Sequence, residues 1–165
     1  MEEDHLLDTR VREALHALGV PYEVVACDPE LADTAAFCES YGFAMEDSAN
    51  TIVVVGKADP RRYVACVVLA TTRLDVNGIV RQRLAVRRAS FASGDETVEV
   101  TGMSIGGVTP FGLPPTLPVW VDRRVVARRR LVFGGGSRAC KVVAGPDVLH
   151  ALPSVEVVDG LAKEA

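Results

Sequence analysis

The sequence predicts a mixed α/β domain in which a buried sheet is covered by helices. Two apolar runs, 51–55 and 63–70, are continuous rather than alternating, and a Gly-Lys-Ala-Asp-Pro turn at 56–60 separates them. Continuous runs of this length are typical of central strands that are covered on both faces. Amphipathic segments elsewhere in the chain are expected to supply the outer helical layer. With 165 residues, 48% of them hydrophobic, we expect a single domain over residues 1–165 with a full core.

The first two helices are expected before these strands. Residues 6–18 alternate charged side chains with leucine and valine at helical spacing, and Gly19 follows as a C-terminal stop. A second helix is expected to begin at Asp33 or Thr34, because the short side chain of either residue can cap its first turn. It is expected to end at Gly42, because glycine commonly follows the last helical residue. The apolar face of the first helix would consist of Leu7, Val11, Leu15 and Leu18.

The remaining elements are separated by turn residues. Further strands are expected at 21–25, 119–121, 129–133 and 138–143, and further helices at 77–84, 93–100 and 146–152. Residues 101–115 are dense in glycine and proline and cannot be regular structure throughout. This segment is therefore expected to be an ordered loop or part of a site.

Charge is distributed unevenly along the chain. Residues 1–50 carry 2 basic and 12 acidic side chains, whereas residues 51–141 carry 15 basic and 6 acidic ones. Arginine accounts for 15 of the 18 basic residues, and its planar guanidinium can pair with two phosphate oxygens. The middle segment could therefore contact a nucleic-acid backbone. Alternatively, these arginines form a solvated face that offsets the acidic first third.

The cysteines and histidines argue against a metal site. The four cysteines contain no C-x-x-C pair and the three histidines are scattered, so we expect free thiols, no metal and no cofactor. The chain begins with the acidic run Met-Glu-Glu-Asp and has no apolar run near the roughly 18 residues that cross a bilayer. We therefore expect a cytoplasmic protein without membrane contact.

The common motifs for nucleotide binding and nucleophilic catalysis are missing from the sequence. There is no phosphate loop, no G-x-G-x-x-G after a strand and no G-x-S-x-G elbow. Any catalysis must rest on backbone amides, hydroxyls, side-chain amides or lysines. The glycine-rich segments 102–112 and 134–136 offer amides that a ligand can approach closely, and they are candidates for two walls of one pocket. Their alternative role is tight-turn geometry.

These glycine segments resemble a known family. Thr101-Gly102 followed by Gly106-Gly107-Val108-Thr109-Pro110-Phe111-Gly112 is similar to the TG…GGxSPxG signature of the YbaK/prolyl-tRNA synthetase-associated domain, with Thr109 in the serine place. Further matches follow in order: Leu117-Pro118 with Val121-Asp122, Gly135-Gly136-Ser137-Arg138, and Pro146-Asp147-Val148-Leu149. The similarity covers nearly the whole chain. Members of this family include free-standing deacylases that hydrolyse mischarged tRNA in trans.

The resemblance implies both a fold and a reaction. The fold would be a mixed α/β domain around a twisted, largely antiparallel central sheet. Water would attack the ester that joins an amino acid to the terminal ribose of tRNA, without a metal, while glycine-loop amides bind the developing oxyanion and substrate hydroxyls help to move protons. The substrate contacts would be Thr51, Thr109, Gly134, Gly135, Gly136 and Ser137, and the tRNA contacts Arg81, Arg83, Arg128 and Arg130.

One position departs from the family pattern. The family usually has a lysine at the start of the first long strand, and Asn50 stands there in this chain. A neutral amide can orient a carbonyl or a water, but it cannot supply a full positive charge. Lys141 on the closing strand could restore that charge, or it could be an ordinary surface residue. The predicted catalytic set is Asn50, Gly106, Gly107 and Lys141.

Three functions remain open on this basis. The first is an active trans-editing deacylase, and the second is a binding protein that keeps the pocket and the tRNA face but lacks the chemistry. The third is a regulatory or scaffolding domain that associates with an aminoacyl-tRNA synthetase. The intact glycine signature favours the first two, with aminoacyl-tRNA as the expected partner.

Overall fold

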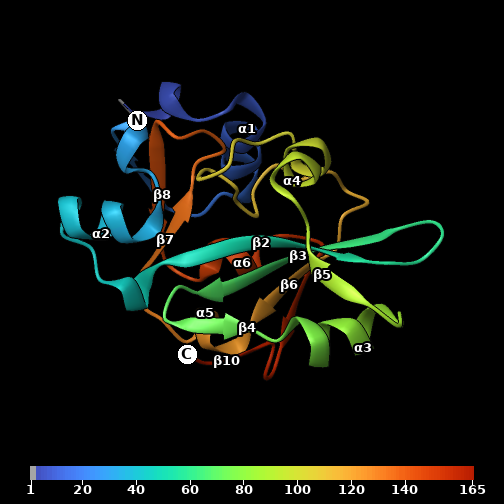
Figure 1. Cartoon of the computed structure of the whole chain (residues 1–165). Helices are drawn as coiled ribbons and strands as arrows, with labels where there is room; N and C mark the ends of the chain where they lie inside the picture. Colours follow the sequence, from blue (N-terminus) through green and yellow to red (C-terminus); the bar gives the residue numbers. More distant parts are fainter. Residues whose placement is uncertain (1–2) are drawn as a thin grey trace.

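A mixed five-stranded sheet forms the centre of the molecule (Figure 1). The computed structural model describes residues 3–165. The strand order is β5-β2-β3-β6-β9, with bounds Ala89–Phe91, Ala49–Gly56, Arg62–Leu69, Val119–Asp122 and Val155–Val158. Strands β5, β2 and β3 pair antiparallel, whereas β6 and β9 are added parallel. The predicted mixed α/β fold is confirmed, and its central sheet is antiparallel in one half only.

Strands β2 and β3 form the long hairpin that the two apolar runs predict. Ala49 pairs with Leu69 at one end, and Gly56 pairs with Arg62 at the other. Residues 64–67 of β3 are all fully buried, so both faces of this strand are covered. Coverage on both faces explains why the sequence shows a continuous apolar run instead of alternation.

One face of the central sheet packs against a smaller antiparallel sheet and three helices. The smaller sheet has the order β1-β8-β7, with bounds Glu23–Ala26, Cys140–Ala144 and Leu131–Gly134, and the helices are α1 (Thr9–Leu18), α5 (Arg123–Val126) and α6 (Asp147–His150). A single parallel bridge between Ser48 and Val132 joins the two sheets at the start of β2. Helix α1 begins at Thr9 rather than at residue 6, because the Asp8 carboxylate accepts a hydrogen bond from the amide of Arg10 and caps the helix there.

The opposite face is covered by a two-stranded sheet and a helical segment. The small sheet pairs β4 (Thr72–Leu74) with β10 (Ala162–Glu164). The helix predicted at 77–84 is divided into a π-helical turn, Val76–Val80, and the single turn α3, Arg81–Leu84. Asp75 caps the segment, because its carboxylate accepts from the amides of Gly78 and Ile79.

Helices α2 (Thr34–Tyr41) and α4 (Gly94–Thr101) lie outside these layers. Helix α4 begins with a capping box between Ser93 and Glu96. Asp33 occupies the N-cap position of α2, but its carboxylate makes no capping bond and pairs with Arg138 instead. Residues 102–118, after α4, contain turns but neither helix nor strand, as their glycine and proline content predicts.

The sequence-based prediction misses several short strands and one short helix. Strands β4, β5, β9 and β10 and helix α5 have only three or four residues each, too few to show a hydrophobic period.

The four cysteines are free and buried. No helix within residues 3–165 combines the length and the apolar character needed to cross a membrane.

We predict that Ala85→Gly stabilises the protein. Ala85 ends α3 at φ 56°, the left-handed region, and it is the one non-glycine residue with positive φ among residues 3–165. Removing its Cβ relieves a steric cost that exceeds the added chain entropy of glycine, so the free energy of unfolding in urea should rise by about 0.5–1 kcal/mol. The matched control is Ala127→Gly at the end of α5, where φ is −84° and no gain is expected. Equal effects of the two changes would contradict the strain at Ala85.

Candidate active site

A cavity of about 280 Å³ opens where the edge of β2 is left unpaired. Strand β5 pairs only with the end of β2, Val54–Gly56, and Ala92 adds one more bond by donating its amide to the carbonyl of Val53 at 2.9 Å. Residues 49–52 therefore border a gap in the sheet. The other walls come from the start of α2, loop 105–108, β7 and β8. The volume lies at the small end for ligand pockets and suits a small ligand group.

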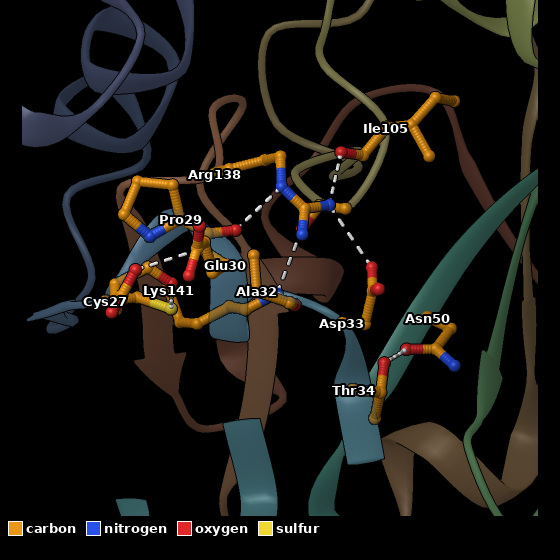
Figure 2. Close-up of polar contacts among 12 residues, drawn as sticks. Cys27, Pro29, Glu30, Ala32, Asp33, Thr34, Asn50, Ile105, Arg138 and Lys141 are labelled. Atoms are coloured by element: carbon orange, nitrogen blue, oxygen red, sulfur yellow. Dashed lines mark hydrogen bonds and ion pairs between the residues drawn. The ribbon is translucent and has the colours of Figure 1, made fainter. Parts of the chain in front are cut away.

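Asn50 lies at this open edge with its amide held in one orientation. The Thr34 hydroxyl, from the first turn of α2, donates to the Asn50 side-chain oxygen at 2.9 Å (Figure 2). The amide nitrogen points to the other side, away from Thr34. Because both residues line the cavity, the NH₂ group of Asn50 is a donor available to a bound carbonyl.

Lys141 on β8 is a buried cation in the cavity wall, not a surface residue. Only 7% of it is exposed, and its ammonium donates to the carbonyls of Ala32 at 2.5 Å and Gly106 at 3.0 Å. The ammonium also lies 5.6 Å from the centre of the Phe37 ring. Desolvation by burial lowers the pKa of Lys141, and the nearby Arg138 lowers it further. The predicted convergence of Lys141 and Asn50 on one cavity is present.

Arg138 connects residues 29–33 with loop 105–108 at the rim of the cavity (Figure 2). Its guanidinium donates to the carbonyl of Pro29 at 2.8 Å, the carbonyl of Ile105 at 3.0 Å and the carboxylate of Asp33 at 3.2 Å. Lys141 links Ala32 to Gly106 beneath it. Two cations, one exposed and one buried, therefore join residues 29–33 to loop 105–108.

In loop 105–108, one amide donates to a nearby backbone carbonyl, and two others have no backbone acceptor among residues 3–165. The Gly107 amide donates to the carbonyl of Ser104 at 2.9 Å, so it is not available to a ligand as the sequence suggested. Gly106 and Val108 both line the cavity, and their amides donate to no backbone oxygen within residues 3–165. Gly106 has φ +89°, which favours glycine. The Gly106 and Val108 amides are therefore two main-chain donors at the cavity that have no backbone acceptor among the described residues.

The structure divides the predicted substrate contacts into two groups. Thr51 and Gly134 line the cavity, although the Thr51 hydroxyl oxygen is buried without a partner. The other residues support the loops behind it: Thr109 is fully buried, Ser137 donates to the carbonyl of Leu6, and the amide of Gly136 donates to the carbonyl of Gly107 at 2.6 Å. Gly135 also lies outside the cavity, since its missing Cβ faces Cys140.

The four predicted tRNA-contacting arginines come from two separate segments, and each has a partner within the protein. Arg81 and Arg83 belong to α3, whereas Arg128 and Arg130 lie between α5 and β7. Arg83 forms an ion pair with Glu156 and lies over the Trp120 ring, and Arg128 forms one with Asp47 at 2.7 Å. Arg130 lies 5.0 Å above Phe43, and Arg81 donates to the carbonyl of Asn77.

Sequence reasoning missed the rim residues of the cavity. Asp33 and Thr34 are predicted as helix caps, and Asp33-Thr34-Ala35 also matches a weaker position of the family pattern. Arg138 is predicted only as part of a glycine-loop match. Their partners are distant in the chain: Arg138 and Asp33 are separated by 105 residues. Their positions within the family-like motifs were the one available indication.

These features define an α/β domain whose small cavity is bordered by free main-chain amides, a side-chain amide and a buried cation. Residues 3–165 contain no group of three or more histidine, cysteine or acidic side chains placed to hold a metal ion. The family model of the aminoacyl-tRNA editing domain matches residues 28–152, a span that includes all cavity-lining residues. The chain therefore belongs to the aminoacyl-tRNA editing domain family, and the resemblance seen in its sequence is confirmed.

Solved structures share this fold over nearly the whole chain. A hypothetical protein designated APE2540 is 26% identical, with a TM-score of 0.80 over 94% of this chain and 99% of the other. A candidate trans-editing enzyme for prolyl tRNA synthetase is also 26% identical, with a TM-score of 0.78 over 94% and 96%. A scaffold protein used for grafting linear epitopes is 22% identical with a TM-score of 0.77 over 94% and 96%, a likeness of fold alone.

We predict that Gly107 is required for folding of the loop rather than for contact with a ligand. A Cβ at Gly107 would lie 2.4 Å from the backbone oxygen of Ser137, whereas one at Gly145 would lie 3.5 Å from that of Arg129. Gly107→Ala should therefore lower the free energy of unfolding by about 1–3 kcal/mol, and Gly145→Ala should change it little. Urea unfolding of both variants tests this. An unchanged free energy of unfolding in Gly107→Ala would contradict the structural role and favour contact between Gly107 and a ligand.

We also predict unequal roles for the two cations. Lys141→Met removes the donor to the buried carbonyl of Ala32 and the half-buried carbonyl of Gly106, and it should cost about 1–3 kcal/mol of stability. Arg138→Met removes bonds at an exposed rim and should cost less than about 1 kcal/mol. Chemical denaturation of both variants gives the comparison. An equal or larger loss in Arg138→Met would show that the exposed cation, not the buried one, holds the wall.

Proposed function

We propose that this protein is an aminoacyl-tRNA deacylase that hydrolyses mischarged tRNA in trans. The observation that carries the proposal is the set of unused donors around one small cavity: the Asn50 amide and the main-chain amides of Gly106 and Val108. Donors held in place before the reaction are what an ester hydrolase needs, because charge develops on the carbonyl oxygen in the transition state. Membership of an editing-domain family supports an aminoacyl ester as the substrate.

In the proposed reaction the acyl group enters the gap beside β2. Water attacks the carbonyl carbon of the ester, and the oxygen that becomes negative is held by the Asn50 and loop amides. The bond to the ribose oxygen then breaks, and that oxygen leaves with a proton, giving a free amino acid and tRNA. Asp33 and Lys141 are the charged residues among those lining the cavity, and Asp33 is paired with Arg138. We therefore assign the proton transfer to a neighbouring ribose hydroxyl of the substrate.

Lys141 supplies positive charge to this site in the proposal. Its ammonium has three donors, of which two point to the carbonyls of Ala32 and Gly106. A fixed cation in a wall with little water stabilises negative charge more strongly than it would in solution. Its burial beside the cavity supports the view that it compensates for the neutral Asn50.

The cellular setting follows from the substrate. Charged tRNA is present in the cytoplasm, which is where we place the protein. Its likeness to a candidate trans-editing enzyme for prolyl tRNA synthetase supports a role beside that synthetase. The second candidate function is a binding protein without chemistry, and the neutral Asn50 in the family's lysine position is what favours it.

We predict that Asn50→Leu lowers the deacylation rate about 100- to 1,000-fold, because it removes an oxyanion donor without changing side-chain size. Thr34→Val should have a smaller effect, since it removes only the bond that orients the amide. The assay incubates the protein with a panel of tRNAs charged with different amino acids and follows the loss of ester.

Gln82→Leu on α3 is the matched control, an amide removed far from the cavity on an exposed helical turn. It should leave the rate unchanged. Binding of charged tRNA by the wild type without any ester loss across the panel would select the binding protein instead.

A further inference from the structure

Strand β5 forms the outer edge of the central sheet and ends at the cavity. It is the last strand in the order β5-β2-β3-β6-β9, so one of its edges is unpaired. Ala92, which directly follows it, lines the cavity and bonds to Val53 of β2. Arg88, which directly precedes it, lies about 13 Å from Ala92 at about 3.3 Å per residue. The strand therefore forms a short track that leads from the surface to the site.

An exposed aromatic ring stands on this track. Phe91 is 57% exposed, more than any other large hydrophobic residue in the described chain. It lies directly opposite Val54, and Ile52 shares the face of Val54 because side chains alternate along a strand. Aromatic side chains reach the diagonal neighbour in such a pair, and Ile52 lines the cavity. The ring therefore lies on the face of the sheet that Ile52 and Asn50 share, one residue before the cavity-lining Ala92.

The far end of the track is positively charged. Lys57, Arg87 and Arg88 are exposed there, and the amide of Lys57 donates to the carbonyl of Arg88 at 2.9 Å, which places these residues side by side. None of the three side chains has a hydrogen bond, ion pair or ring contact with residues 3–165. They differ in this from Arg83 and Arg128, which are neutralised by Glu156 and Asp47.

We propose that β5 and its flanking residues seat the unpaired 3′ end of an RNA strand. The Phe91 ring stacks on a base next to the cavity, and Lys57, Arg87 and Arg88 contact the phosphates that precede it. An exposed ring beside unpaired cations is the combination that binds single strands, because every base has a face that can stack and every linkage carries a charge. A duplex would present phosphates but no free base face to Phe91. The proposal rests on the proposed function, since it is the tRNA end that brings an ester to the cavity.

The first test uses an uncharged RNA hairpin with a short unpaired 3′ extension, and the same hairpin with an abasic terminal nucleotide. Phe91→Ala should weaken binding of the intact hairpin about 5- to 150-fold. It should leave the already weaker abasic hairpin nearly unaffected, and Phe91→Trp should retain the affinity for the intact one. Val98→Ala on α4 is the control, because Val98 is also an exposed apolar residue, at 43%, and should change neither affinity.

The second test measures how affinity for the intact hairpin depends on salt. Reversing both charges in Arg87→Glu with Arg88→Glu should flatten the slope of log K against log salt by about 0.7 for each phosphate that the variant no longer neutralises. Arg129→Glu removes an exposed arginine that lies between α5 and β7 and has no side-chain partner among residues 3–165, and it should leave the slope unchanged.

Each outcome separates this proposal from the deacylase itself. No binding of the hairpin by the wild type, an equal loss for intact and abasic hairpins in Phe91→Ala, or equal salt slopes in the two arginine variants would each overturn the β5 seat. Because the hairpin carries no amino acid, hydrolysis does not enter the measurement. Binding as expected together with no ester loss from charged tRNA would retain the seat and reject the deacylase.

Discussion

A buried ammonium group determines the shape of the site. Lys141 lies inside the protein and forms no ion pair with a carboxylate of residues 3–165, and desolvation lowers its pKa. Removing an ammonium from water is costly, and the carbonyls of Ala32 and Gly106 offset that cost only while both stay within hydrogen-bond distance. The two segments that carry these carbonyls are therefore coupled through one side chain. The cavity between them keeps its width because neither segment can move without exposing an unpaired charge or carbonyl.

The sequence predicts the fold well where a single strand or helix carries its own pattern. The continuous apolar runs of β2 and β3 follow from burial on both faces, and the helix expected at 93–100 corresponds to α4. Lys141 and Asn50 are also predicted together, because a family resemblance places their strands beside one pocket. What the sequence does not contain is the direction of each amide. Gly107 is predicted to face the ligand, yet its amide is used by Ser104, three residues away.

The arginines illustrate a second limit of sequence-based prediction. Fifteen arginines look equivalent in the sequence, but their electrostatic roles depend on partners that are far away in the chain. Arg128 meets Asp47 across 81 residues, and Arg83 meets Glu156 across 73. An arginine paired with a carboxylate attracts a phosphate only weakly, because the two charges of the pair offset each other. Tertiary pairing thus selects which cations remain free, and only a three-dimensional arrangement identifies them.

The unpaired stretch of β2 has a consequence for self-association. An open strand edge with free amides and carbonyls is a template on which another chain can add a strand, and proteins usually protect such edges. Here the start of α2 and loop 105–108 stand in front of the edge and leave space only for a small group. The walls that would admit an ester thus also exclude a neighbouring polypeptide. The residues that form the cavity wall therefore also cover the open strand edge. A change that displaced this wall would disrupt the site and expose the edge to aggregation at the same time.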